Sequence, residues 1–316
     1  MAISVYLLFL FLSGALCIID LEVYDKIKEN SSFEVLEYDQ IREIFKNVHK
    51  PNPDEVIRKR QELEEHISSK LKEVDDLKPF LALTKPKLYV PNEYDPRKIM
   101  PDCFTKPKHQ GNCGSCYIFA PVAAYESRMC LLSGGKIKPE LSQEDILSCG
   151  TKHNKCGGGL ITDTWEYLEN TGASSYQCKP YVSSMGSVPT CTYKCDNPKL
   201  TYDKWMTVQG SLHIFGNFDY QQMKEQIYNW GPINAFMETF EDLWAYRGGL
   251  YFHKTGKPTE AHAITIIGWG YDSSTKSEYW IIRNSWGPDW GEGGYLKVAF
   301  GLYGIGSYVA TSVPYV

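Results

Sequence analysis

The chain of 316 residues is long enough for one large or two smaller domains, and its 43% of hydrophobic and 14% of aromatic residues are ample for a core. Its 33 basic and 38 acidic residues leave a formal net charge of −5, too little asymmetry to predict nucleic acid or an anionic membrane as a partner. We therefore expect a globular protein that does not bind nucleic acid.

Residues 1–17 are typical of a signal peptide. An apolar run from Val5 to Leu12 precedes the small residues Ser13 to Ala15, and the run is too short to cross a membrane comfortably. No Lys or Arg stands before it, so a buried N-terminal helix is the alternative. The signal-peptide interpretation predicts entry into the secretory pathway and no membrane span in the mature protein.

Residues 18–89 are charged, poor in glycine and free of cysteine. After Pro53, apolar residues recur at helical spacings as far as Leu77, which predicts one amphipathic helix, and a second, shorter helix is expected from Phe33 to Val48. An ordinary helical subdomain and a removable, inhibitory propeptide both fit this segment.

The stretch from Lys78 to Pro101 contains five prolines, spaced too closely for a helix or a central strand. We expect an extended, exposed connector that suits cleavage by a protease, at about residues 85–92. Upstream of it, Asn30-Ser31-Ser32 is an N-glycosylation sequon with Asn30 as the acceptor.

The ten cysteines favour an oxidising compartment, where cysteines pair. Cys17 belongs to the signal region and Cys116 to a candidate catalytic site, so eight remain to form four disulfides. Eight cysteines allow roughly a hundred pairings, and their spacing does not fix the connectivity. The eight are Cys103, Cys113, Cys130, Cys149, Cys156, Cys178, Cys191 and Cys195.

The two halves of residues 90–316 differ in their predicted secondary structure. Helices are expected from Cys116 onward and from Ile161 to Asn170, within the half that holds all eight pairing cysteines. The half from Trp205 onward has no cysteine, and apolar segments between Gly-rich turns predict strands there. These strands are 233–237, 263–269, 279–283 and 294–298, so we expect an α+β fold.

Cys116 is the candidate nucleophile. A thiol becomes a good nucleophile when its thiolate is stabilised by a helix N-terminus or an imidazolium. Gly114-Ser115 has the composition of a turn, which predicts that Cys116 lies in the first turn of the helix that follows. The Cys116 backbone N–H and the Gln110 side-chain amide are suitable donors to an oxyanion.

His262 is the candidate base among seven histidines. It is the polar residue at the entry of an apolar strand, where a side chain can face a cleft. Asn284 ends another predicted strand and is the candidate that orients the imidazole, and Trp286 is placed to shield their hydrogen bond from water. The other histidines are His49, His66, His109, His153, His213 and His253.

Together these motifs resemble those of the papain family of cysteine peptidases, and within it the cathepsin B-like branch, over about Val90 to Val316. The resemblance rests on Cys113-Gly114-Ser115-Cys116-Tyr117 with Gln110 upstream, His262-Ala263-Ile264 before Gly268-Trp269-Gly270, Asn284-Ser285-Trp286-Gly287 with Trp290-Gly291, and Cys156-Gly157-Gly158-Gly159. It implies a papain-like fold of two subdomains with the cleft between them, a propeptide at 18–89, and Cys116, His262, Asn284 and Gln110 as the catalytic set.

The resemblance also implies the ligands and pairings of the domain. Gly158 and Gly159 would pair with the substrate backbone, beside Trp286, and the Cys116 thiol would have a low pKa. The partners implied are protein and peptide substrates, the chain's own propeptide and cystatin-type inhibitors; a monomer in a lysosome, a vacuole or the extracellular space is expected, without cofactor or metal. The implied disulfides are Cys103–Cys130, Cys113–Cys156, Cys149–Cys191 and Cys178–Cys195.

Two departures from cathepsin B alter the expected specificity. The segment between Cys178 and Cys195 is short and has no histidine, whereas cathepsin B carries paired histidines on a long occluding loop there, so we expect an endopeptidase with little or no dipeptidyl carboxypeptidase activity. Tyr308 stands where cathepsin B has an acidic residue in the pocket for the substrate's second residue. An apolar or aromatic side chain is therefore expected in that pocket.

Other classes of protein remain as alternatives. Cys113-x-x-Cys116 also resembles a thiol redox pair or half of a zinc site, although Cys130 lacks the second partner that a zinc site needs. A redox protein would not need the Asn284 motif. A non-catalytic papain-like binding protein is disfavoured because no catalytic position is replaced.

Overall fold

The computed structural model describes residues 19–46, 48, 58, 61, 65 and 90–315. The signal peptide predicted at 1–17 and nearly all of the helix predicted between Pro53 and Leu77 lie outside the described residues.

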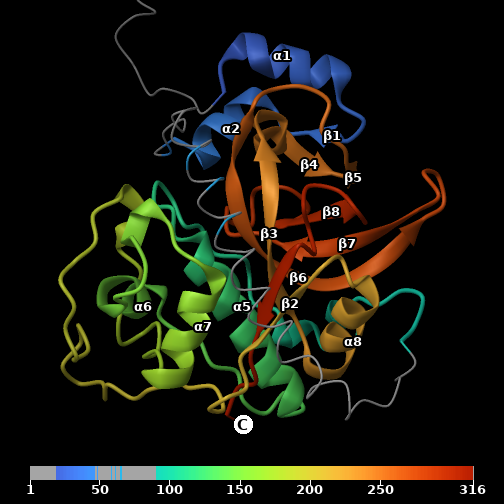
Figure 1. Cartoon of the computed structure of the whole chain (residues 1–316). Coiled ribbons are helices and arrows are strands. Elements are labelled where there is room, and N and C mark those ends of the chain that lie inside the picture. The colour runs from blue at the N-terminus through green and yellow to red at the C-terminus, as the bar shows by residue number, and fades with distance from the viewer. Residues whose placement is uncertain are drawn as a thin grey trace, which may run out of the picture.

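A helical part and a sheet part lie side by side, with α5 between them and the N-terminal helices on top of the sheet part (Figure 1). The helices are α1 Leu21–Asn30, α2 Tyr38–Ile44, α5 Cys116–Leu132, α6 Gln143–Cys149, α7 Ile161–Asn170 and α8 Tyr220–Trp230. The strands are β1 Glu34–Val35, β2 His213–Gly216, β3 Ile233–Phe240, β4 Tyr246–Gly248, β5 Leu250–Tyr251, β6 Pro258–Asp272, β7 Ser277–Arg283, β8 Tyr295–Ala299 and β9 Tyr308–Thr311. The predicted α+β class with two subdomains is confirmed.

One seven-stranded sheet, in the order β2-β9-β3-β6-β7-β8-β5, forms the second half of the chain. Its long central strand β6 pairs antiparallel with β3 and β7, and only the edge pair β5–β8 is parallel. The four strands predicted from sequence correspond to β3, β6, β7 and β8. Because β6 is buried over most of its length, the residues at its entry are held against the rest of the core.

Helix α5 begins at Cys116, as predicted, and is buried along most of its length. Pro121 lies inside it and has no N–H to give to the carbonyl of Tyr117, four residues earlier. That carbonyl instead accepts a hydrogen bond of 2.9 Å from the Thr164 hydroxyl of α7. The proline therefore leaves no buried carbonyl without a partner, and the substitute hydrogen bond links α7 to α5. Helix α7 has the predicted bounds.

The N-terminal segment packs on the sheet part. Strand β1 pairs antiparallel with β4, and the ring of Phe33 lies 5.1 Å from that of Tyr251. The helix predicted from Phe33 to Val48 is partly wrong, because Glu34–Val35 pairs with β4 instead. Helix α2 begins only after Glu37, whose backbone N–H donates 3.1 Å to the Gln40 side chain.

The connector predicted to be extended and exposed is described from residue 90 onward, and that part is packed. Tyr94 forms a β-bridge with Trp269 of β6, and Pro96 is buried. Pro96 and Pro101 each open a 3₁₀ turn, Pro96–Lys98 and Pro101–Cys103, because proline suits the first position of a helical turn. The upstream part of the connector lies outside the described residues.

Eight cysteines form four disulfides in the same pairs that the papain-family resemblance implies. The bonds join Cys103 to Cys130, Cys113 to Cys156, Cys149 to Cys191 and Cys178 to Cys195. All eight lie in the helical half, where two of the disulfides attach neighbouring segments to α5 through Cys130 and to α6 through Cys149.

Candidate active site

The Cys116 thiol lies where α5 meets β6. Ser115 is the N-cap of α5, so Cys116 is its first helical residue, and the Ala263 N–H of β6 lies 3.5 Å from Cys116 Sγ. Cys116 is the one free cysteine in the part of the chain that the structure describes. Because Cys113 is bonded to Cys156, the pair Cys113 and Cys116 is not available for thiol redox exchange.

His262, next to Ala263 on β6, has a defined tautomer. Its Nε2 lies 2.8 Å from Asn284 Oδ1, and the Ser285 N–H donates 2.7 Å to the same oxygen. That second donor identifies the Asn284 atom as the oxygen, which can only accept, so Nε2 carries the imidazole proton. The Nδ1 of His262 is buried without a hydrogen-bond partner among the described residues, which leaves it as a free base.

The aromatic rings around His262 exclude water from it. The Trp286 ring lies 5.0 Å from the imidazole, and Trp290 packs edge-on against Trp286 at 4.9 Å. His262 is 1% exposed and Asn284 5% exposed, so their hydrogen bond is dry. Trp290 itself is fully buried and belongs to the core of the sheet part.

Gln110, on the loop that precedes Cys116, is held by several hydrogen bonds. Its Nε2 donates 2.8 Å to the Cys113 carbonyl, and its Oε1 accepts 2.6 Å from the Ser285 hydroxyl. The Gln110 N–H donates 2.9 Å to the Ser285 carbonyl. One Nε2 hydrogen therefore remains for an incoming oxyanion, and its direction is fixed by contacts on both sides.

In the intact chain, both the Cys116 thiol and the His262 imidazole are favoured in their neutral forms. Burial, with a smaller contribution from the Glu260 carboxylate, raises the pKa of the Cys116 thiol to about 12. Burial also lowers the pKa of His262 to about 4, although the hydrogen bond to Asn284 opposes this. The low thiol pKa implied by the family resemblance is therefore not found in the intact chain, because desolvation outweighs the donors at the helix N-terminus.

A family model of papain family cysteine proteases matches residues 90–313. The chain belongs to this family. A cathepsin B-like cysteine proteinase of Caenorhabditis elegans is 34% identical over 258 residues, which are 71% of this chain and 76% of that protein. A cathepsin B-like protein of Giardia intestinalis, CP3, is 34% identical over 213 residues, 66% of this chain and 69% of its own length.

Solved structures of the papain family share the fold. Procathepsin B from Trypanosoma congolense superposes with a TM-score of 0.67 at 24% identity, covering 74% of this chain and 82% of that one. The proform of the ragweed allergen Amb a 11, a cysteine protease, gives a TM-score of 0.59 at 26% identity, with 72% and 66% covered. The chain is thus a cathepsin B-like cysteine protease of the papain family.

Tyr117 packs closely against the glycine segment, residues 156–159. The Tyr117 hydroxyl donates 3.0 Å to the Lys155 carbonyl, and a Cβ on Gly159 would lie 2.7 Å from the Tyr117 ring. Gly158 has φ of +109° with open space where a side chain would be, so only glycine suits this backbone. The glycine segment is half-buried in the intact chain.

Tyr308 is fully buried at the start of β9. Its hydroxyl lies 3.2 Å from the Thr162 hydroxyl and its ring stacks at 6.2 Å on Phe236. The ring thus fills the position between α7 and the sheet with an aromatic surface and places no charge there.

The N-terminal segment covers one side of the site. A cavity of about 630 Å³ lies between the α2 region and the wall formed by His109, Ser184 and Trp286. His109 Nε2 lies 3.0 Å from the Ile44 carbonyl, and the Phe45 ring packs edge-on against Trp286 at 5.5 Å. Access to the catalytic residues from this side therefore depends on the segment that α2 belongs to.

Several residues at the site escaped the sequence analysis. Ser285 was considered only as part of a motif, although its hydroxyl and carbonyl hold Gln110. His109 and Glu260 interact with Ile44 and Cys116, which are distant from them in sequence, so local spacing gives no signal for either residue. Among the described residues, no cluster of His, Cys, Asp and Glu is placed to hold a metal ion, and no helix is long and apolar enough to span a membrane.

Proposed function

We propose that this papain-family chain is a cysteine endopeptidase made as an inactive precursor. The observation that carries the proposal is the tautomer of His262, whose unpaired Nδ1 lies on the strand that also contacts the free Cys116 thiol. Asn284 is the orienting residue. Gln110 and the Cys116 N–H are the donors to the oxyanion.

The reaction follows from these roles. The Cys116 thiol gives its proton to His262 Nδ1 and the sulfur attacks the peptide carbonyl carbon, so that negative charge develops on the carbonyl oxygen. The carbon–nitrogen bond breaks as His262 returns the proton to the leaving amine, which leaves a thioester on Cys116. Water, deprotonated by His262, then attacks the thioester, and the carboxylic acid and the thiol are released.

The short Cys178–Cys195 segment supports cleavage within chains. These cysteines are 17 positions apart, and no histidine stands between them to bind a substrate's C-terminal carboxylate. The cleft is therefore open beyond the scissile bond on this side once the N-terminal segment is removed. Dipeptidyl carboxypeptidase activity should be weak or absent.

The expected maturation and substrate contacts complete the proposal. Residues 18–89 act as the propeptide of a 90–316 peptidase domain in the secretory pathway, which the four disulfides favour. The exposed Asn30 is its glycosylation site. Gly158 and Gly159 bind the substrate backbone, Trp286 lines the cleft, and the buried Tyr308 ring, which places no charge behind the pocket, favours an apolar second residue in the substrate.

Active-site labelling tests this function. The chain freed of residues 18–89 should react with a thiol-reactive peptide epoxide and cleave an internally quenched peptide, while Cys116→Ala should do neither. Removal of C-terminal dipeptides, assayed in parallel, should be at least about tenfold slower than internal cleavage. The proposal fails if the freed wild-type enzyme neither labels nor cleaves, and its endopeptidase part fails if dipeptide removal dominates.

Acidification should weaken the docking of the N-terminal segment through His109. The Gly111 N–H donates 2.9 Å to Nδ1, so Nε2 carries the proton that faces the Ile44 carbonyl. Burial lowers the pKa of His109, so its neutral form contributes to docking above its ordinary pKa of 6.5 and this contribution is lost as the pH falls below that value. A second proton, on Nδ1, would point at the Gly111 N–H and would break the hydrogen bond that Nδ1 accepts from it.

Inhibition of the freed enzyme by a peptide of residues 18–89, measured between pH 7.5 and 5, checks this expectation. The wild-type inhibition constant should rise up to about tenfold, since one proton is taken up, and His109→Gln should flatten the change. Glu43, Lys46 and Asp289 line the same cavity, so the range stops above the pH where the carboxylates titrate. A profile identical in both enzymes would exclude His109.

A further inference from the structure

A tyrosine outside the catalytic motifs touches both ends of the loop that precedes the nucleophile. The Tyr181 hydroxyl donates 2.8 Å to the Gln110 carbonyl and lies 3.1 Å from the Ser115 hydroxyl. Ser115 is the N-cap of α5, yet its side chain makes no capping bond to its own helix. These hydrogen bonds connect Ser115 through Tyr181 to Gln110. They therefore link Gln110, which carries one proposed oxyanion donor, to the residue just before Cys116, which carries the other.

The segment that carries Tyr181 also packs on this loop through its backbone. The Asn112 N–H donates 2.7 Å to the Ser184 carbonyl. Gly111 has φ of +68°, and a Cβ there would lie 2.4 Å from the same carbonyl oxygen. The hydrogen bond holds the loop against the Tyr181 segment, and the close contact of the two backbones leaves the loop no room to move nearer to it.

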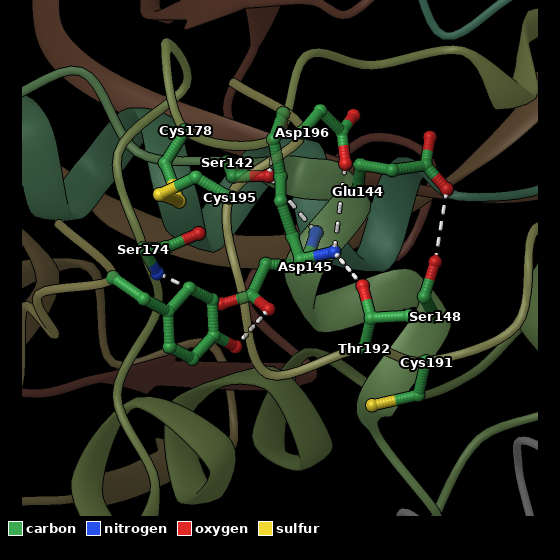
Figure 2. A network of polar contacts seen from close by, with 12 residues as sticks. Ser142, Glu144, Asp145, Ser148, Ser174, Cys178, Cys191, Thr192, Cys195 and Asp196 are labelled. Atoms are coloured by element: carbon green, nitrogen blue, oxygen red, sulfur yellow. Dashed lines mark hydrogen bonds and ion pairs between the residues drawn. A yellow bond between two sulfur atoms is a disulfide. The ribbon is translucent and has the colours of Figure 1, made fainter. Parts of the chain in front are cut away.

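Glu144 of α6 holds the Tyr181 segment in place. Its buried carboxylate accepts four hydrogen bonds, from Val182 N–H at 2.9 Å, Ser183 N–H at 3.1 Å, the Ser183 hydroxyl at 2.8 Å and the Ser148 hydroxyl at 3.1 Å. Figure 2 shows Glu144 in the polar network around α6, with the Ser148 hydroxyl turned toward its carboxylate. A charged acceptor with several donors is a stiff anchor in a buried place.

The same network fixes the residues before Tyr181. The Ser142 hydroxyl donates 2.6 Å to the Lys179 carbonyl, and Lys179 Nζ donates 2.7 Å to the Thr192 hydroxyl (Figure 2). Two disulfides, Cys149–Cys191 and Cys178–Cys195, close the segment at both ends. Tyr181 therefore lies on a segment that is held rigidly between α6 and the loop that contains Gln110.

We propose that Tyr181 is a positioning residue for the oxyanion donors, anchored by Glu144. The inference rests on the proposed peptidase function and adds a residue to it. An oxyanion donor stabilises the transition state only when it is aimed before the reaction begins, and a small misplacement costs rate while substrate binding is kept. The Tyr181 hydroxyl holds the Gln110 carbonyl, while the Ser285 carbonyl holds the Gln110 N–H.

Three assays on the full chain, folded and then processed, separate positioning from a general structural effect. Tyr181→Phe should lower kcat about tenfold with KM within twofold, less than the roughly 10²–10³ lost when an oxyanion donor is removed outright. The affinity for a peptide aldehyde, which forms a tetrahedral adduct with its oxygen among the same donors, should fall in parallel. Alkylation of Cys116 by iodoacetamide, which creates no oxyanion, should keep its rate and pH profile.

Tyr202→Phe is the matched control, because its hydroxyl bonds 2.6 Å to Asp145 of the same helix but has no contact with Gln110 among those recorded. It should leave all three readouts unchanged. Glu144→Gln, which keeps the shape of the anchor but removes acceptor capacity, should reproduce the kcat loss of Tyr181→Phe. The inference is overturned if kcat of Tyr181→Phe stays within twofold of wild type, if only KM changes, or if alkylation falls together with turnover. A wild-type enzyme that alkylates but never turns over a peptide contradicts the proposed function instead.

Discussion

Iodoacetamide should alkylate Cys116 in the intact chain at least about 10³-fold more slowly at pH 7 than in the enzyme freed of residues 18–89. Burial raises the pKa of this thiol to about 12 in the intact chain, so only about one molecule in 10⁵ would carry the thiolate at pH 7. Removal of the N-terminal segment admits water to the cleft. The proton can then pass to His262, and the resulting ion pair favours the thiolate.

The slope of the alkylation rate against pH should also differ between the intact chain and the freed enzyme. In the intact chain the rate should rise about tenfold per pH unit through the neutral and alkaline range, because only deprotonation of an isolated thiol supplies the nucleophile. In the freed enzyme, an ion pair with His262 should keep the rate high down to acidic pH and flatten this slope. Residue-specific mass spectrometry measures both, since the other described cysteines are in disulfides.

Matched variants make that result interpretable. Cys116→Ala gives the background of the label, and a chain blocked against processing by changes at its cleavage site shows the intact rate over long incubations. Equal rates in the intact and freed proteins would contradict the closed, neutral site. If the alkylation rate of the intact chain stayed high down to acidic pH, the ion pair between Cys116 and His262 would already exist before processing.

The neutral imidazole has its own consequence for stability. Burial lowers the pKa of His262 to about 4 from an ordinary value of 6.5, so the unfolded state binds the proton more readily. The stability that depends on neutral His262 is complete above pH 6.5 and is lost as the pH falls toward 4. A zymogen that enters an acidic compartment is therefore destabilised at the residue that we propose as the catalytic base.

Much of the fold could be predicted because the decisive patterns are local. Helix α7 and the strands β3, β6, β7 and β8 follow from apolar periodicity and from glycines between the segments. The pairing of β1 with β4 could not be predicted in this way, because Glu34–Val35 is a strand only through a partner more than 200 residues away in sequence. Tertiary contact there overrides a helical pattern.

The residues of the candidate site likewise fall into those found from local motifs and those found only from contacts between distant parts of the chain. Cys116, His262 and Asn284 lie in motifs whose residue types are unusual for a core, and each motif points to a role by itself. Tyr181 bonds to a residue 71 positions earlier, and its sequence context is an ordinary loop. Supporting contacts of this kind become visible only when the chain is folded, because they depend on which loops a disulfide or a buried carboxylate brings together.

His262→Ala should lower kcat/KM by about 10²–10⁴, the usual contribution of general acid–base catalysis. The variant removes the base whose unpaired Nδ1 is next in sequence to the Ala263 contact with Cys116, and it leaves Asn284 bonded to the Ser285 N–H. The loss should appear mainly in kcat, because the substrate backbone would still meet Gly158 and Gly159. Steady-state kinetics with an internally quenched peptide measure it, and exogenous imidazole that fits the vacated space beside Trp286 should restore part of the rate.

Control variants distinguish lost catalysis from lost folding. His213→Ala removes an imidazole that stacks on Phe215 at 4.9 Å, away from the cleft, and should retain nearly full activity. The melting temperature of His262→Ala should change by only a few degrees, since the buried imidazole has one hydrogen bond to lose. If His262→Ala kept wild-type kcat/KM, another group would have to deprotonate Cys116, and the assignment of His262 Nδ1 as the base would be wrong. If it lost activity only by unfolding, Asn284 and Trp286 would need His262 for packing rather than for proton transfer.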